Sequence, residues 1–323
     1  MKRSLFWLLD QYAQTGESVA QVHQTALDHA TLADDLGFTS LWLAEHHFET
    51  LGTAPNPAVL LAAMAQRTET IRLGPAIAVL PVHNPILLAE DYALVDALSG
   101  GRLNMGVGSG SQQSEFVPFG LDFESRKEVS AKNLSILRER WRAASRGDVG
   151  STSLNVAPVQ SPTPPIYVAT TTEQTAYQVG LAGDSLLTLV SPAADGLDGV
   201  AACVRAHGRG LEEVGVPDGV AEAVVMVLAH VAETNAEAEA TAAPALARLL
   251  LSMAGVELSD AGAFYEQMRQ NGVGLFGTLA EVGQQLDRFA DIGVRHLAFM
   301  SRFGGMPRAA AERSLRLLAP GAA

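Results

Sequence analysis

Short apolar runs alternate with longer amphipathic stretches along the whole chain. The short runs, of which 4–10 and 39–45 are examples, have the length and apolar content of buried strands. The longer stretches carry apolar residues at helical spacing, and several begin near a proline or end at a glycine, as helices commonly do. The pattern therefore predicts strands that alternate with helices. The expected strands are 4–10, 39–45, 71–81, 102–110, 166–171, 185–190, 220–231 and 294–300.

Eight strands that alternate with helices predict a parallel barrel of the α/β class, a (β/α)8 or TIM barrel. We expect one barrel domain over 1–323, with a helical insertion at about 233–277, between strands seven and eight, that forms a partial lid. A doubly wound open sheet is the alternative, disfavoured because no G-x-G-x-x-G turn follows the first strand. The expected helices are 19–37, 56–69, 84–101, 127–147, 173–183, 197–215, 233–269, 278–293 and 307–320.

Composition and charge argue against several classes of protein. No apolar run reaches the roughly 18–20 residues of a membrane span, so we expect no membrane partner. The N-terminal apolar run stops at Asp10, which favours a first strand over a signal peptide. The lone cysteine, Cys203, cannot form an internal disulfide, which fits a reducing, cytoplasmic compartment. The net charge of −13 argues against general binding to nucleic acid.

The sharpest chemical feature is the run Glu45-His46-His47 at the end of the second expected strand. In a barrel of this kind, function lies at the carboxyl ends of the strands. Neighbouring strand residues point to opposite sides, so Glu45 and His47 are expected to face one way and His46 the other. A histidine held by a carboxylate for acid/base work, a structural pair and a metal site are the three interpretations. A metal is the weakest, because no second His/Asp cluster has ligand spacing, and we expect none.

Three further strand ends are candidate binding sites. The Gly-Ser-Gly-Ser loop at 108–111 either offers backbone N–H groups to an anion or is an ordinary turn. The three threonines at 170–172, just before a helix, can bind a phosphate. Ordinary capping of that helix by Thr171 or Thr172 is the alternative, and the residues alone favour it. Arg302, after the eighth strand, is either an anion contact or a solvated surface side chain.

Several longer motifs follow one another along nearly the whole chain. They are SLWLAEHHF at 40–48, PNPAVLLAAMAQRTETIRLG at 55–74, VLPVHNPILLAEDYALVDALSGGRLNMGVGSG at 79–110, FVPFGLDFESR at 116–126, PPIYVATTTEQTA at 164–176, FGTLAEV at 276–282 and FGGMP at 303–307. In this order they resemble the motifs of the bacterial luciferase-like flavin-dependent monooxygenases. EHHF, together with HNP and LSGGR, is the specific part of the resemblance.

The resemblance implies a luciferase-like (β/α)8 barrel, in agreement with the pattern. Members of the family use reduced FMN, which a flavin reductase supplies in two-component systems, and O2 to oxygenate a small organic substrate through a C4a-hydroperoxyflavin. The flavin carries that chemistry, and the protein positions it and keeps water out. The alternatives are a deazaflavin-dependent dehydrogenase on the same barrel and a non-catalytic flavin-binding protein. The EHHF run favours the oxygenase branch.

The resemblance also implies roles for individual residues. His46 falls on the family's active-site histidine, which supports the flavin peroxide and the proton transfers, and Glu45 falls on a neighbouring acidic position near the flavin. Ala76 and Ile77 fall where luciferases carry a non-proline cis peptide bond beneath the flavin ring, so we predict one there. The stretch that cradles the flavin phosphate falls on Thr171, Thr172 and Thr175, which shifts the balance from capping to binding.

One position departs from the family pattern. Luciferase-like members often place an arginine in the fourth-strand loop, where it pairs with the FMN phosphate, and this chain has Ser109 there. A serine cannot supply the charge of an arginine–phosphate pair. We therefore expect either weak FMN binding, which suits a two-component enzyme, or an arginine that enters from elsewhere. Gly108 and Ser109 are both expected to contact the cofactor.

The resemblance further implies a homodimer, because the family pairs barrels through the helices after strands two and three. Those helices are rich in apolar residues, although helices outside a barrel also need apolar faces against the strands. The strand-end loops offer few charges, so we expect a neutral or aromatic small-molecule substrate. The apolar residues of the two helices include Val59, Leu60, Leu61, Met64, Leu87, Leu88, Tyr92, Leu94 and Val95.

Overall fold

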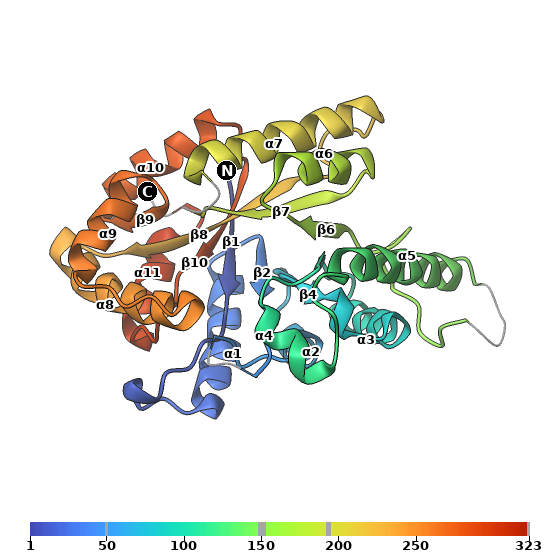
Figure 1. Cartoon of the computed structure of the whole chain (residues 1–323), viewed down its shortest axis with the longest axis horizontal. Helices are drawn as coiled ribbons and strands as arrows, with labels where there is room; N and C mark the ends of the chain where they lie inside the picture. Colours follow the sequence, from blue (N-terminus) through green and yellow to red (C-terminus); the bar gives the residue numbers. More distant parts are fainter. Residues whose placement is uncertain (49–50, 148–152, 192–194, 322–323) are drawn as a thin grey trace.

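Parallel strands form the centre of the protein in the computed structural model, which describes residues 1–48, 51–147, 153–191 and 195–321 (Figure 1). Strands form at all eight expected positions, with ends shifted by a few residues, and the third expected strand is divided into two. The strands are β1 (Lys2–Trp7), β2 (Ser40–Leu43), β3 (Arg72–Pro75), β4 (Ala78–Val79), β5 (Met105–Gly108), β6 (Ile166–Ala169), β7 (Ser185–Leu189), β8 (Ala223–Val231), β9 (Gly274–Gly277) and β10 (His296–Met300).

The strands close into a ring. β1 pairs with β2 and β10, β2 pairs with β3, and the pairing continues from β4 to β8 and on to β10, always parallel. Leu73 of β3 bridges to Leu103, just before β5, and the Asn104 N–H donates to the Leu73 carbonyl at 2.8 Å. A doubly wound open sheet would leave two free edges, so that alternative is wrong, and the predicted barrel is confirmed.

The third strand is broken, whereas the sequence predicts one continuous strand at 71–81. Ala76 and Ile77 separate β3 from β4, and the peptide bond between them is cis, which confirms that prediction. A short 3-10 helix, Leu80–Val82, then ends the strand early. Pro81 explains this end, because its nitrogen has no N–H to donate to a neighbouring strand.

Helices surround the barrel, and local side-chain chemistry starts several of them. They are α1 (Val19–Asp35), α2 (Pro57–Ala65), α3 (Pro85–Leu98), α4 (Gln113–Phe116), α5 (Arg126–Ser145), α6 (Glu173–Leu181), α7 (Gly196–Glu213), α8 (Asn235–Ala254), α9 (Ala261–Gln270), α10 (Leu279–Asp291) and α11 (Arg308–Leu318). Asn56 and Asn84 cap α2 and α3, each followed by a proline. Ser18 and Thr278 form capping boxes at the starts of α1 and α10.

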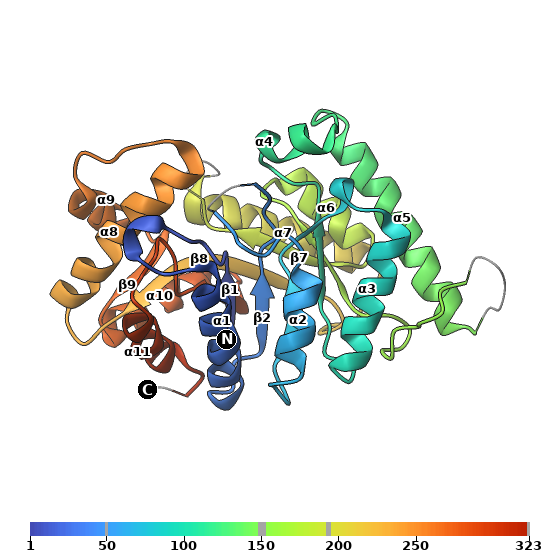
Figure 2. The same cartoon turned by 90° about the horizontal axis from the view of Figure 1, so that it is seen from below.

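The predicted insertion at 233–277 contains the helices α8 and α9, but its last residues form a strand. β9 pairs in parallel with the outer part of β8, from Leu228 with Gly274 to Val231 with Gly277. The expectation of helical structure is wrong here because all four residues of β9 are buried, and so short a run shows no alternation. Figure 2 shows α8 and α9 at the same end of the barrel as α4, the end toward which β2 points.

A polar cluster lies among the amino ends of the barrel strands. Ser4 Oγ lies 2.6 Å from His296 Nε2 and 2.7 Å from Ser40 Oγ. Glu222, just before β8, accepts hydrogen bonds of 2.9 Å from both Tyr167 Oη and Lys2 Nζ. These contacts join the starts of β1, β2, β6, β8 and β10.

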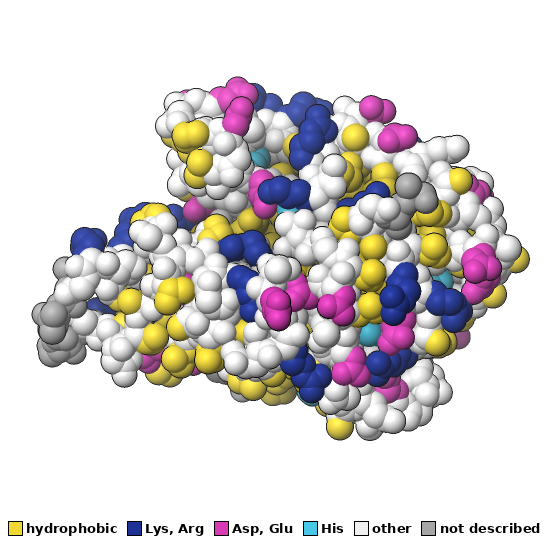
Figure 3. Space-filling model, turned by 180° about the vertical axis from the view of Figure 1, so that it is seen from behind, with side chains coloured by type: hydrophobic (Ala, Val, Ile, Leu, Met, Phe, Trp, Pro, Cys, Tyr) yellow, Lys and Arg dark blue, Asp and Glu magenta, His cyan; other side chains and the backbone are white. Residues whose placement is uncertain are grey.

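The surface mixes charges of both signs. Seen from behind, Lys and Arg side chains are interspersed with Asp and Glu side chains (Figure 3). In the ranges that the structure describes, no helix has the length and apolar character needed to cross a membrane.

Candidate active site

The side chains after β2 alternate at the mouth of the barrel, the end where the strands have their carboxyl ends. His47 Nε2 lies 3.1 Å from Glu45 Oε1, so these two side chains share one side, as predicted. His46 Nδ1 instead lies 2.8 Å from Glu115 Oε1. The run therefore makes two separate carboxylate–imidazole contacts. Among the described residues, no three His, Cys, Asp or Glu side chains are arranged to hold a metal ion.

Glu45 is a buried anchor between two strand ends. Its Oε1 also accepts from His83 Nε2 at 2.8 Å, and its Oε2 accepts from the Val79 N–H at 3.3 Å. Burial by itself raises the pKa of Glu45, but the hydrogen bonds from His47 and His83 outweigh it and hold the pKa below its ordinary value. Burial lowers the pKa of His83, and the hydrogen bond to Glu45 more than reverses this. Glu45 thus ties the end of β2 to the end of β4.

Glu115 holds His46, and the motifs do not single it out. Its carboxylate is 3% exposed and also accepts the backbone N–H of His47 at 3.0 Å. The short helix α4, just after β5, carries it to this position. The one available signal in the sequence is that Glu115 is the only acidic residue between 103 and 121. With Glu115 on Nδ1, the imidazole has a fixed orientation and its Nε2 is left for a proton or a ligand.

The segment after His46 packs against the end of β1. A Cβ at Gly52 would lie 3.0 Å from His46 Cβ and 2.9 Å from the Leu8 carbonyl oxygen, so glycine suits this close approach. The Thr53 N–H donates to the Leu9 carbonyl at 3.0 Å. The end of β1 therefore supports the segment that carries His46.

The residues predicted to lie at the flavin ring come together. Ile77 is half-buried and packs on Gly108, where a Cβ would overlap Ile77 Cδ1. Ala76 is 9% exposed and belongs, with Trp42 and Tyr167, to the apolar layer inside the barrel. A glycine-backed, apolar surface at the strand ends fits one face of a planar ring.

The threonines at the start of α6 leave the helix N-terminus open. Thr172 occupies the N-cap position, but its side chain makes no capping hydrogen bond. Its hydroxyl donates to Thr175 Oγ1 at 2.9 Å, and its N–H donates to Thr170 Oγ1 at 3.2 Å. Thr171, Thr172 and Thr175 are all exposed. Exposed hydroxyls and uncapped N–H groups fit a phosphate better than the alternative of ordinary capping does.

Ser109 lies at the end of the strand next to the one that leads to these threonines. Val107 of β5 pairs with Val168 of β6, so residue 109 and the 170–172 run leave adjacent strands. An arginine of another helix lies at the start of α6, where it pairs with a carboxylate. Arg209 of α7 places its Nη2 3.0 Å from Glu173 Oε1, in the first turn of α6.

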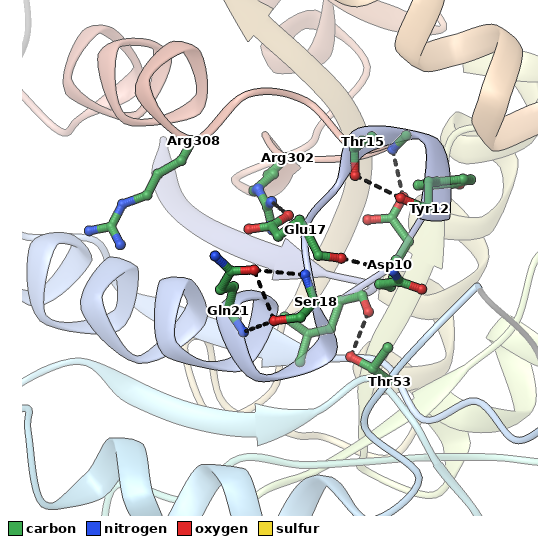
Figure 4. A network of polar contacts seen from close by, with 12 residues as sticks. Asp10, Tyr12, Thr15, Glu17, Ser18, Gln21, Thr53, Arg302 and Arg308 are labelled. Carbon is green, nitrogen blue, oxygen red and sulfur yellow. Dashed lines mark hydrogen bonds and ion pairs between the residues drawn. The ribbon is translucent and has the colours of Figure 1, made fainter.

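A second polar network lies where the loops after β1 and β10 meet (Figure 4). Arg302 is 8% exposed and pairs with Glu17, so its interpretation as a solvated surface side chain is wrong. Asp10 is 3% exposed and accepts the Gly304 N–H at 2.6 Å. Burial raises the pKa of Asp10 to about 6, although the Gly304 hydrogen bond and the charge of Arg302 act in the other direction.

Comparison of sequences shows which known proteins the chain is similar to. The model of the luciferase-like monooxygenase family matches residues 1–296. The chain is 35% identical over 194 residues to the uncharacterised protein y4vJ of Sinorhizobium fredii, which covers 58% of this chain and 55% of that protein. It is 30% identical over 177 residues to the oxygenase component of the flavin-dependent trigonelline monooxygenase of Acinetobacter baylyi, covering 52% and 49%. The chain thus spans about half the length of these curated relatives.

Solved structures share the fold over the full chain. Monooxygenase RslO1 of Streptomyces bottropensis has a TM-score of 0.87 at 24% identity, covering 99% of this chain and 98% of that one. The oxygenating constituent of 3,6-diketocamphane monooxygenase of Pseudomonas putida, solved with FMN, has a TM-score of 0.78 at 18% identity, covering 100% and 98%. An F420-dependent secondary alcohol dehydrogenase has a TM-score of 0.69 at 17% identity, covering 100% and 99%.

Proposed function

Because the chain belongs to the luciferase-like monooxygenase family, we propose that it uses reduced FMN and O2, through a C4a-hydroperoxyflavin, to oxygenate a small organic substrate. The His46–Glu115 pair at the mouth of the barrel is the observation that carries this proposal. The trigonelline relative is named as an oxygenase component, which supports a separate flavin reductase as a transient partner here. The buried lone thiol of Cys203 agrees with action in the cytoplasm.

The chain's own residues have distinct parts in this proposal. The flavin, when bound, supplies the activation of oxygen, and the protein orients it and manages protons. His46, fixed through Nδ1 by Glu115, holds or moves a proton at its Nε2. Glu45 keeps the two strand ends together and carries a charge close to the site. Ala76, Ile77 and Gly108 would support the ring, and Ser109, Thr171, Thr172 and Thr175 would hold the phosphate.

The rim of the mouth supports a neutral or aromatic substrate. Phe48 and Phe119 are 65% and 41% exposed, and their ring centroids lie 5.2 Å apart. His47 contacts Phe119 edge-on at 5.0 Å, which places this aromatic pair beside the histidines. Exposed rings in such an arrangement favour flat apolar compounds over charged ones.

The test is a titration with FMN, oxidised and photoreduced, followed by mixing of the reduced complex with O2. We expect reduced FMN to bind and its oxidation to be slowed, with hydrogen peroxide released slowly when substrate is absent. Immediate collapse to oxidised FMN and peroxide would contradict the oxygenase proposal. Stoichiometric binding without turnover, with a reductase present, would point to a flavin-binding protein instead.

A deazaflavin-dependent dehydrogenase is the second candidate, and Ser109 is the observation that favours it. FMN loses its expected arginine partner at this position, and a deazaflavin enzyme shares the fold. The two candidate functions differ in whether the reaction consumes O2. Hydride transfer to or from a deazaflavin proceeds without consumption of O2, so an oxygen electrode distinguishes them.

A further inference from the structure

The turn at Gly304 joins the barrel to the insertion. Gly304 and Gly305 have φ values of +58° and +67°, which favour glycine. A Cβ at Gly304 would overlap the carbonyl of Ala245 in α8, and Arg248 Nε of the same helix donates to the Gly304 carbonyl at 2.5 Å. Helix α8 therefore rests directly on the backbone of this turn.

Asp10 holds the same turn from the barrel side. Its buried carboxylate accepts the Gly304 N–H at 2.6 Å, and Glu17, farther along the loop after β1, pairs with Arg302 (Figure 4). A Cβ at Gly305 would lie 3.2 Å from Tyr12 Cδ2. The loop after β1 thus contacts residues 302–305 through the side chains of Asp10, Tyr12 and Glu17. Helix α8 covers the same turn from the outside.

The segment that carries Asp10 also contacts the segment that carries His46. The Leu9 carbonyl accepts both the N–H and the hydroxyl of Thr53, at 3.0 and 2.9 Å. The Leu8 carbonyl lies against Gly52, which in turn lies against His46. Asp10 therefore directly follows Leu9, whose carbonyl binds the segment that carries His46. Its own carboxylate is hydrogen-bonded to the turn beneath α8.

We propose that Asp10 is a positioning residue that seats helix α8 of the insertion at the mouth of the barrel through the Gly304 turn. Loss of its carboxylate leaves the buried Gly304 N–H without an acceptor, and an unpaired buried donor favours opening of the turn. Helix α8 then separates from the Gly304 turn more often, while the hydrogen bonds of the rest of the barrel stay intact. Only the effect on turnover rests on the proposed function.

Several charged or titratable groups surround Asp10. Its ionised form is the stronger acceptor, so the turn is held best above pH 6. Burial and the charge of Arg302 lower the pKa of His29 to about 4, so His29 stays neutral over the range in which Asp10 titrates. The groups that face Asp10 and its loop are Tyr12, Glu17, His29 of α1, Arg248 of α8 and Arg302.

Hydrogen exchange measured by mass spectrometry tests the proposal at fixed pH. Asp10→Ala should raise exchange in peptides from 241–254 and 303–306 by about tenfold or more, without a matching rise in α3 and α5. Asp10→Asn should show a smaller rise, because its amide oxygen still accepts. Unchanged exchange in α8, or an equal rise everywhere, would overturn the proposal.

Asp96→Asn is the matched control. Asp96 is also fully buried, and it accepts the N–H groups of Val159 and Gln160 at 2.8 and 3.0 Å, away from α8. This variant should leave exchange in α8 at its wild-type level. If Asp10→Ala does not fold, Arg248→Met removes the contact from the helix side and should open the same two segments.

Steady-state kinetics adds a functional readout. With reduced FMN and O2 as the probes, Asp10→Ala should raise the KM for reduced FMN more than it lowers the kcat for O2 consumption, because a displaced α8 weakens the closed site more than it alters the histidine. An unchanged KM would overturn the positioning role. If the wild-type protein shows no turnover, the proposed function fails, and the exchange experiment still decides where Asp10 acts.

Discussion

At the scale of single residues, the atoms of His46 have separate tasks. Nδ1 is hydrogen-bonded to Glu115 Oε1 at 2.8 Å, so only Nε2 can face a bound flavin or substrate. The family motif identifies His46 but not its partner, because Glu115 lies 69 residues away along the chain and meets it only in the folded barrel. Glu45, the acid that the sequence places beside His46, is taken by His47 and His83.

His46→Ala should lower the yield of oxygenated product by about 100-fold or more, the range of general acid–base catalysis. The measurement is the fraction of consumed O2 that appears in product, with hydrogen peroxide as the remainder. FMN binding should change little, since the phosphate residues are untouched. An unchanged product yield would remove His46 from the mechanism.

Glu115→Gln tests whether Glu115 acts through His46. The single variant should lower the yield, and the double variant should be no worse than His46→Ala alone, because residues that act as a unit are not additive. Fully additive losses would show that Glu115 has a separate role.

Glu222 predicts a pH dependence of stability. Burial alone raises its pKa, but the hydrogen bond and charge of His296, with Lys2, lower the folded pKa to about 2. The stability that Glu222 contributes is therefore present above its ordinary pKa of 4.5 and is lost as pH falls from there toward 2. The difference in free energy of unfolding between wild type and Glu222→Gln should be largest at pH 6 and narrow steadily toward pH 3. Urea unfolding measures this, and a constant difference would contradict the assignment.

At the scale of elements, α6 and α7 cross at two glycines. A Cβ at Gly180 would overlap the carbonyl of His207 and lie 3.0 Å from Gly210 Cα. The backbones of the two helices thus touch where they cross. This close crossing fixes the position of α6, whose start carries the threonines proposed to hold the flavin phosphate.

Gly180→Ala should destabilise the protein by about 1–3 kcal/mol, the usual cost of overpacking, and should weaken binding of FMN. Gly208→Ala is the control on α7, because no neighbouring atom lies within 4 Å of a Cβ there. It should be neutral or stabilising by up to about 1 kcal/mol through helix propensity. Thermal unfolding and FMN titration check both variants, and equal stability of the two would argue against a tight crossing.

The helices and strands differ in how well the sequence alone could predict them. Capped, periodic segments such as α1 and α10 were predictable, because Ser18 and Thr278 mark their starts locally. The four residues of β9 were not, since their strand state depends on pairing with Leu228–Val231 of β8 rather than on their own pattern. The cis peptide bond at Ala76–Ile77 was predictable from the family resemblance, but the break between β3 and β4 was not, because the apolar run at 71–81 predicts one strand.

At the scale of the whole molecule, α2 and α3 present apolar side chains to the outside. Val59 and Leu87 are 69% and 59% exposed, and Leu94 and Leu98 are 49% and 50% exposed. These exposed side chains do not pack against the strands, so they favour the homodimer that the family resemblance implies over the alternative that such residues only pack on the barrel.

Leu87→Glu should therefore convert a dimer into a monomer, because a charge at the centre of an apolar interface is costly to bury. Size-exclusion chromatography with light scattering at micromolar concentration gives the mass. Val220→Glu is the control, since Val220 is 64% exposed but lies on the loop before β8. A wild-type protein that is monomeric at this concentration would reject the dimer.

The parallel pairing of β9 with β8 has a consequence for protein engineering. Parallel neighbours cannot be joined by a tight turn, so the chain between them must be a crossover of about a dozen residues or more. Residues 232–273 are therefore an exchangeable module with two fixed attachment points on the rim. Crossover segments from other barrels could be grafted there to change which substrates reach the site. Each graft would need a side chain or backbone group that contacts the Gly304 turn, as α8 does here.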